Sequence, residues 1–237
     1  MEGARMALLG KAAMLLWFDV IPEMIDEHDD WHTREHFPER VAIPGFIRAQ
    51  RWVSIAGGPR YLVVYEVTDI DVLASAAYLE RLNNPTPWTR RMMPGYRGMV
   101  RGFCKVESRH GSVLGTTGLT LRYSAAPGNE HRLDAWLRDD VVPDLLPRRG
   151  FTSAFMLRSD RAPEMTAEQQ IRGRDAGVER VLLATGYSPA LLESLARTEL
   201  GAERLESHGA MPGAIPGVFQ LACVSGPATV HPEFHRP

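Results

Sequence analysis

The feature that most constrains the fold of this chain is an internal repeat of its sequence skeleton. Four residues of the first half recur 105 positions later, in the pairs Trp31 and Trp136, Pro38 and Pro143, Gly45 and Gly150, and Phe46 and Phe151. Nearer the end of each half the offset becomes 119, as in the pairs Gly98 and Gly217, and Cys104 and Cys223. Matches in register over this length predict two copies of one supersecondary unit, with 14 extra residues in the second copy.

The first half has the sequence pattern of strand, helix, strand, strand, helix, strand. Apolar or alternating runs predict strands at 12–19, 46–55, 61–67 and 98–107. Pro22 and the acidic residues after it predict a helix from 22 to about 36, and an aspartate cap predicts a second helix that ends near 82. This βαββαβ order is that of a ferredoxin-like unit.

The second half repeats the order. We expect strands at 119–123, 151–157, 178–184 and 218–224, and helices at 130–142 and 189–198. The extra residues fall in the polar stretch 159–175, which we interpret as an extended hairpin loop. With 111–117 as the linker, the predicted units are 1–112 and 113–237.

A four-stranded sheet with helices on one face leaves its other face open. Two such units cover these faces when they pack sheet to sheet. The predicted fold is therefore α+β, with two ferredoxin-like units forming an intramolecular pseudo-dimer, an α/β barrel with its helices outside.

Composition excludes several classes of protein. A net charge of −2 argues against a broad nucleic-acid surface, and 44% hydrophobic with 24% charged residues is typical of a globular chain. No stretch approaches the roughly 20 apolar residues of a membrane span. The apolar run 6–18 contains Lys11 and ends at Asp19, which favours a buried strand over a signal peptide. Two distant cysteines, Cys104 and Cys223, predict neither a disulfide scaffold nor a metal site and favour the cytoplasm.

Several motifs carry a resemblance to a known group of proteins. They are W-H-x-x-E-H-x-P from Trp31, P-G-F from Pro44, the strand that ends near Trp52, YLVVYEV from Tyr61, and N-P-T-P-W-T from Asn84. This combination resembles the dimeric α/β-barrel superfamily and, within it, EthD-like proteins. The resemblance covers most of the first half in detail and the second half in skeleton. It implies one of several activities, among them cofactor-free monooxygenase, isomerase, polyketide cyclase, dehydratase and haem protein, or no catalysis.

Three histidines, His28, His32 and His36, are spaced four apart and share one face of the predicted helix. Histidine titrates near neutral pH, which suits a general acid or base. The positions equivalent to His32 and His36 in the second half are Leu137 and Val141, which are typical core residues. We therefore expect both histidines to face inward and to be the catalytic candidates, although a structural role on a polar helix is the alternative.

Metal and haem sites have weaker support. Histidines at i and i+4 can ligate zinc, but a catalytic zinc needs a third ligand, and Thr33 stands where a zincin has glutamate. A haem would need an axial histidine, for which the second half offers His131 and His208. We predict no metal and no cofactor.

Large aromatic residues could form the wall of a pocket for a planar hydrophobic ligand, although such residues are most often core. The candidates for substrate binding are Trp31, Arg51, Trp52, Tyr61, Tyr65, Glu66 and Trp88. Among them Arg51 could hold a carboxylate or enolate oxygen, or simply face solvent. Tyr61, Tyr65 and Glu66 align with Arg180, Ala184 and Thr185, so their chemistry is not repeated.

Two functions remain open at this point. The first is a cofactor-independent enzyme on a small hydrophobic, aromatic or polyketide-like substrate, in which His32 or His36 moves a proton and Tyr61, Tyr65 or Arg51 stabilises the oxyanion. The alternative is a non-catalytic small-molecule-binding or stress-related protein. In either case the expected partner is a small molecule, with no nucleic acid and no membrane, and self-association into a homo-oligomer is left open.

Overall fold

The computed structural model describes residues 7–160, 166–172 and 175–227. Within these residues, eight strands close into one antiparallel barrel in the order β1-β3-β2-β9-β5-β8-β6-β4, with β4 pairing back to β1. The strands are β1 (Ala12–Val20), β2 (Phe46–Ala56), β3 (Tyr61–Val67), β4 (Tyr96–His110), β5 (Thr117–Tyr123), β6 (Phe151–Ser159), β8 (Arg180–Gly186) and β9 (Ile215–Ser225).

Each half contributes four neighbouring strands. Their order is β4-β1-β3-β2 in the first half and β9-β5-β8-β6 in the second, which is the same order of equivalent strands. The edge strands of the two halves then pair with each other, β2 with β9 and β4 with β6. Closure leaves no free edge among the eight barrel strands, which removes the unpaired backbone groups of an open sheet. The predicted α+β fold, two ferredoxin-like sheets closed into a barrel, is confirmed.

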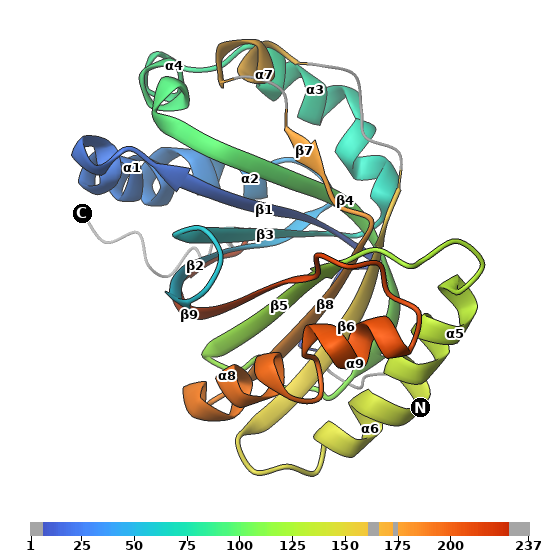
Figure 1. Cartoon of the computed structure of the whole chain (residues 1–237). Helices are drawn as coiled ribbons and strands as arrows, with labels where there is room; N and C mark the ends of the chain where they lie inside the picture. Colours follow the sequence, from blue (N-terminus) through green and yellow to red (C-terminus); the bar gives the residue numbers. More distant parts are fainter. Residues whose placement is uncertain (1–6, 161–165, 173–174, 228–237) are drawn as a thin grey trace, which may run out of the picture.

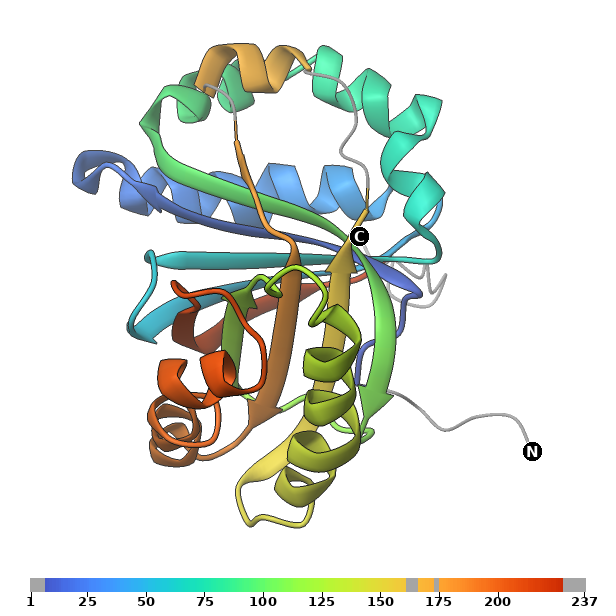
Figure 2. The same cartoon turned by 45° about the vertical axis from the view of Figure 1, so that its right-hand side comes forward.

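The helices lie outside the barrel, in one layer for each half, as Figure 1 and Figure 2 show. The first layer contains η1 (Pro22–Met24), α1 (Ile25–Trp31), η2 (His32–His36), α2 (Phe37–Val41), η3 (Ile70–Ala74), α3 (Ala76–Asn83), α4 (Pro87–Met92) and η4 (Met93–Gly95). The second contains α5 (Glu130–Ala135), η5 (Trp136–Val141), α6 (Val142–Leu145), α8 (Pro189–Arg197) and α9 (Ala202–Ser207).

Strand alternation divides the core into three clusters. On β3, Tyr61, Val63 and Tyr65 pack under the helices of the first half, whereas Leu62 and Val64 point into the barrel. The barrel interior combines side chains of both halves. A third cluster lies between the second half's sheet and its helices. The barrel interior is therefore a packed core, and each half has a separate apolar layer between its sheet and the helices that cover it.

The inserted stretch differs from the expected hairpin loop. Ala167–Arg172 form a helix, α7, and Ala176–Gly177 form a short strand, β7, parallel to β4. The prediction of a loop is therefore wrong for these residues; 161–165 and 173–174 lie outside the described residues. In Figure 1, α7 lies beside α3 and α4, so the second half contributes a helix to the first half's layer. The polar sequence gave no sign of this because the contacts of α7 that the described residues show, such as Glu168 with Arg40 and Ala167 with Asn83, are polar ones across the tertiary structure.

Two further properties concern the whole described chain. No helix in it is long and apolar enough to cross a membrane. Cys104 and Cys223 are both free thiols; Cys104 is buried and Cys223 is partly exposed.

Candidate functional site

The helix that carries the histidines contains a π-helical turn. The N–H of Phe37 donates to the carbonyl of His32, five residues earlier. Pro38 follows. Proline has no N–H to donate to the carbonyl four residues earlier, and its ring clashes with that carbonyl. A π turn absorbs such a disruption without ending the helix, so α2 continues to Val41.

The second half has the same turn at the equivalent place. The N–H of Val142 donates to the carbonyl of Leu137, and Pro143 follows. Because π turns are often found at functional sites, a turn in the first half alone would point to function. Its presence in both halves, each time before a proline, identifies it as part of the scaffold.

The three histidines form a buried row. The ring centroids of His28 and His32 are 4.8 Å apart, and those of His32 and His36 are 5.3 Å apart. Trp31 and Phe37 pack against this row, with centroids 4.4 Å from His36 and 4.3 Å from His32 respectively. The exposed fractions of His32 and His36 are 2% and 7%. The histidines therefore share one inward face.

A cavity of about 30 Å³ lies between this row and the sheet of the first half. His32, His36 and Tyr65 line it, as do the apolar side chains of β1 and β4. It has room for about one water molecule. Of the residues expected to form a site, these three are the ones that the structure brings to the cavity.

His32 and Tyr65 each present an unused polar group here. Among the described residues, neither His32 Nδ1 nor the Tyr65 hydroxyl has a hydrogen-bond partner. Burial lowers the pKa of His32 well below its usual value, and the nearby His28 and His36 add to this shift. Burial also raises the pKa of Tyr65 well above its usual value. At neutral pH the cavity wall thus holds a neutral imidazole and a protonated phenol.

A polar cluster centred on Asp29 lies at one end of the row. Tyr61 donates a hydrogen bond of 2.9 Å to Asp29 Oδ1, and an Arg51 nitrogen lies 3.3 Å from the same oxygen. His28 bridges Asp29 and Tyr96, at 3.2 Å from each. Partial burial alone would raise the pKa of Asp29, but the hydrogen bond from His28, the charge of Arg51 and the bond from Tyr61 hold it below its usual value. Tyr61 and Arg51 therefore fix the helix to the sheet through Asp29.

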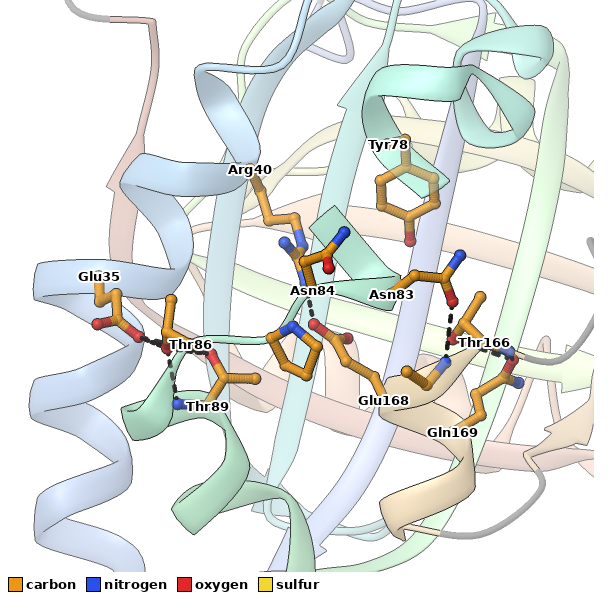
Figure 3. A network of polar contacts seen from close by, with 12 residues as sticks. Glu35, Arg40, Tyr78, Asn83, Asn84, Thr86, Thr89, Thr166, Glu168 and Gln169 are labelled. Atoms are coloured by element: carbon orange, nitrogen blue, oxygen red, sulfur yellow. Dashed lines mark hydrogen bonds and ion pairs between the residues drawn. The ribbon is translucent and has the colours of Figure 1, made fainter. Parts of the chain in front are cut away.

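At the other end, two buried ion pairs join the first half to the insertion. Arg40 Nη2 lies 2.6 Å from Glu168 Oε1, and Arg101 Nη2 lies 2.7 Å from Asp175 Oδ2. Arg40, Arg101 and Glu168 line the cavity. Figure 3 shows Glu168 reaching from α7 to Arg40, beside Tyr78 of α3.

The remaining predicted residues lie elsewhere. Trp52 and Glu66 point into the barrel, where Trp52 donates to Gln50 and Glu66 accepts from Gln50 and Arg48. They are on the opposite face of the sheet from the histidines. Two further predicted side chains pack in the helix layer without lining the cavity: Trp31, which donates to Glu35, and Trp88, which donates to Glu27.

Sequence reasoning missed the charged residues of the cavity. Arg40 continues the series 28, 32, 36 with the same spacing, so its position on the inward face was readable from the sequence. Glu168 and Asp175 were not readable, because only the tertiary structure brings the insertion to the first half. Within the described part of the chain, no group of three or more histidine, cysteine, aspartate or glutamate side chains is placed to hold a metal ion.

Comparison with known proteins identifies the fold. No protein-family model matches the sequence, and no curated protein matches it. An anthrone oxidase-like protein of known structure superposes with a TM-score of 0.68 at 11% identity, over 93% of this chain and 95% of its own. The chain has the dimeric α/β-barrel fold.

Two further solved structures share this barrel. A putative monooxygenase from Fusobacterium nucleatum has a TM-score of 0.59 at 8% identity, over 92% of this chain and 95% of its own. One from Lactobacillus acidophilus has a TM-score of 0.56 at 7% identity, over 91% and 95%. At these identities the similarity shows the fold alone. The three solved structures are named as an anthrone oxidase-like protein and two putative monooxygenases.

Proposed function

We propose that the chain is an EthD-like, cofactor-independent oxidase or monooxygenase that acts on a small, planar, hydrophobic substrate such as an anthrone. The first half, residues 1–112, would carry the site, and the second half, 113–237, would be a degenerate copy of the same unit. The names of the structural neighbours support this class of reaction.

One observation carries the proposal. A neutral His32 imidazole and a protonated Tyr65 hydroxyl line the same buried cavity, and among the described residues His32 Nδ1 and the Tyr65 hydroxyl have no hydrogen-bond partner. A buried polar atom without a partner is costly, so its retention favours a role toward a ligand. The equivalent positions, Leu137 and Ala184, are apolar and buried.

These groups suit oxidation of an activated methylene. The His32 imidazole takes a proton from the carbon, and Tyr65 donates a hydrogen bond to the oxygen of the enolate that forms. The enolate carbon reduces O₂ and forms a carbon–oxygen bond, and the peroxide anion takes the proton back from the His32 imidazolium to give the hydroperoxide. Loss of water from the hydroperoxide leaves a carbonyl, so that one CH₂ and one O₂ become one C=O and one H₂O, with no other reductant.

Substrate binding requires more room than the cavity now has. Met14, Met93 and Met99 line it, and methionine is flexible enough to repack around a ligand. The other wall that can yield is α7, which contributes Glu168.

The test is O₂ uptake with anthrone as substrate. We expect the wild type to consume O₂ and form anthraquinone, and H32L, which introduces the residue of the second half, to lose at least about a hundredfold in rate. H131Q is the matched control, since His131 is exposed on α5 and should leave the rate unchanged. A folded H32L variant with the wild-type rate would contradict the proposal. Saturable binding of anthrone without O₂ uptake would favour the non-catalytic, ligand-binding alternative.

A further inference from the structure

We propose that the ligand of this cavity is an acid, and that its anionic group binds Arg40 in the place that Glu168 now occupies. The inference rests on the proposed function for the location of the site, and adds the chemical class of the preferred substrate: a planar aromatic carboxylate or a similarly acidic oxygen, for which neutral anthrone is a weaker-binding model compound.

The first step is the environment of Arg40. Its exposed fraction is 2%, it lies at the cavity wall, and its guanidinium carbon is 6.0 Å from the centre of the Tyr78 ring. Glu168, 4% exposed at its side chain, supplies the opposing charge. An arginine guanidinium binds carboxylates with a geometry that few other groups match. The cavity therefore already contains a carboxylate-binding site, filled by the chain's own glutamate.

The second step is how α7 is held. Ala167 N–H donates to Asn83 Oδ1 over 3.1 Å, and Glu168 pairs with Arg40. Nearby, Asp175 pairs with Arg101 and accepts a hydrogen bond from Gln169. Among the described residues, none from α7 belongs to the apolar cluster of the first half. In the part of the chain that the structure describes, the α7 wall of the cavity is thus held by charged and polar contacts.

A ligand larger than the cavity must replace the charge that Glu168 supplies to Arg40. An aromatic ring does not fit in about 30 Å³, so the ligand must displace part of the wall. Displacing Glu168 would leave Arg40 as an unpaired buried charge, which is strongly unfavourable. A ligand that brings its own anionic group restores the pair, whereas a neutral ligand of the same shape does not. Replacement of the Glu168 carboxylate by an anionic group of the ligand therefore favours acidic ligands over neutral ones.

Comparison with the second half supports a role for Arg40 beyond packing. At the positions equivalent to Arg40 and Arg101 it has Leu145 and Gln220, and Leu145 is buried in the apolar cluster of its own layer. The same scaffold therefore packs without a buried arginine at this place, so the charge is not a requirement of the fold.

The test compares binding of 2-naphthoate and 2-naphthamide, two probes of nearly the same shape, by isothermal titration calorimetry. In E168Q the competing carboxylate is gone, and we expect naphthoate to bind about tenfold tighter than to the wild type, with naphthamide changed less than about twofold. The double variant R40Q/E168Q keeps a neutral hydrogen-bonding pair and should bind both probes equally. D134N, which removes one of the two carboxylates paired with the buried Arg180 in the second half, is the matched control and should leave both affinities unchanged.

The outcomes separate the two proposals. An equal gain for both probes in E168Q would mean that the variant only opens the cavity, and it would overturn acid recognition while the proposed function stands. No gain for naphthoate, or a preference for naphthoate that survives in R40Q/E168Q, would also overturn it. If neither probe binds any variant and neither slows anthrone oxidation, acid recognition at Arg40 is overturned, whereas the proposed function is decided separately by the rate of O₂ uptake in H32L.

Discussion

At the scale of residues, the halves of the barrel differ in chemistry along one face of one helix. Positions 28, 32, 36 and 40 are His, His, His and Arg in the first half, and the equivalent positions 133, 137, 141 and 145 are Leu, Leu, Val and Leu. All eight side chains are buried. The same scaffold thus holds titratable groups in one half and aliphatic groups in the other, which makes pairwise substitutions natural tests.

The depressed pKa of His32 predicts how stability depends on pH. In the unfolded chain His32 takes up a proton below about pH 6.5, whereas burial keeps it neutral in the folded protein. Stability is therefore retained above this pH and falls as the pH is lowered through it. Between pH 7.5 and 5.5, urea unfolding should show a loss about 1 kcal/mol larger for the wild type than for H32L. H131Q should behave as the wild type. An equal loss of unfolding free energy in H32L and the wild type would contradict a lowered pKa of His32.

Tyr65 and Tyr61 offer a matched pair for stability. The Tyr65 hydroxyl is buried without a partner among the described residues, whereas the Tyr61 hydroxyl donates to Asp29. Y65F should leave the free energy of unfolding unchanged or raise it by up to about 1 kcal/mol, and Y61F should lower it by about 1 kcal/mol. Urea denaturation measures both, and O₂ uptake should fall in Y65F. A clear loss of stability in Y65F would show that its hydroxyl has a structural partner.

At the scale of elements, the sequence predicts most strands and helices of the barrel, whereas contacts between distant elements could not be predicted from it. The aromatic, β-branched and aliphatic run 61–67 predicts β3. Neighbours on a strand point to opposite faces, which separates Tyr65 from Glu66 and Arg51 from Trp52. The four side chains therefore cannot line one pocket on one face of the sheet, although all four were predicted to bind substrate. The π turn before Pro38 was not predicted because its hydrogen-bond pattern leaves no mark on hydrophobic spacing.

Helix α7 should open more readily than the barrel. It is anchored by ion pairs and hydrogen bonds, so removing Glu168 should release it locally without lowering global stability much. In E168Q we expect the backbone amides of residues 167–172 to exchange with solvent at least about tenfold faster, while those of β3 keep their rates. D134N should leave both regions unchanged. Faster exchange throughout the barrel would instead mean that the Arg40 pair stabilises the whole fold.

At the scale of the whole molecule, the residue matches between the two halves of the sequence predicted the architecture, because two open four-stranded sheets each have an apolar face that the other can cover. The barrel interior draws side chains from both halves, among them Trp17 and Trp52 from the first and Phe155 and Phe219 from the second. The halves should therefore unfold together.

Truncating one interior side chain tests this coupling. Phe155 is fully buried, so F155A should lower the free energy of unfolding by about 3–5 kcal/mol. Hydrogen exchange should accelerate together in β3 and β8, which belong to different halves. Y187A, at an exposed tyrosine, should change stability by less than about 0.5 kcal/mol. Faster exchange confined to β8 would show that the halves unfold independently.

Proton abstraction by His32 in the first half's cavity is measured alone by exchange of the anthrone methylene protons in D₂O without O₂. The wild type and H131Q should accelerate deuterium incorporation well above the buffer rate, and H32L should return it to the buffer rate. Incorporation at the buffer rate in the wild type, or an H32L rate equal to that of the wild type, would contradict proton abstraction by His32.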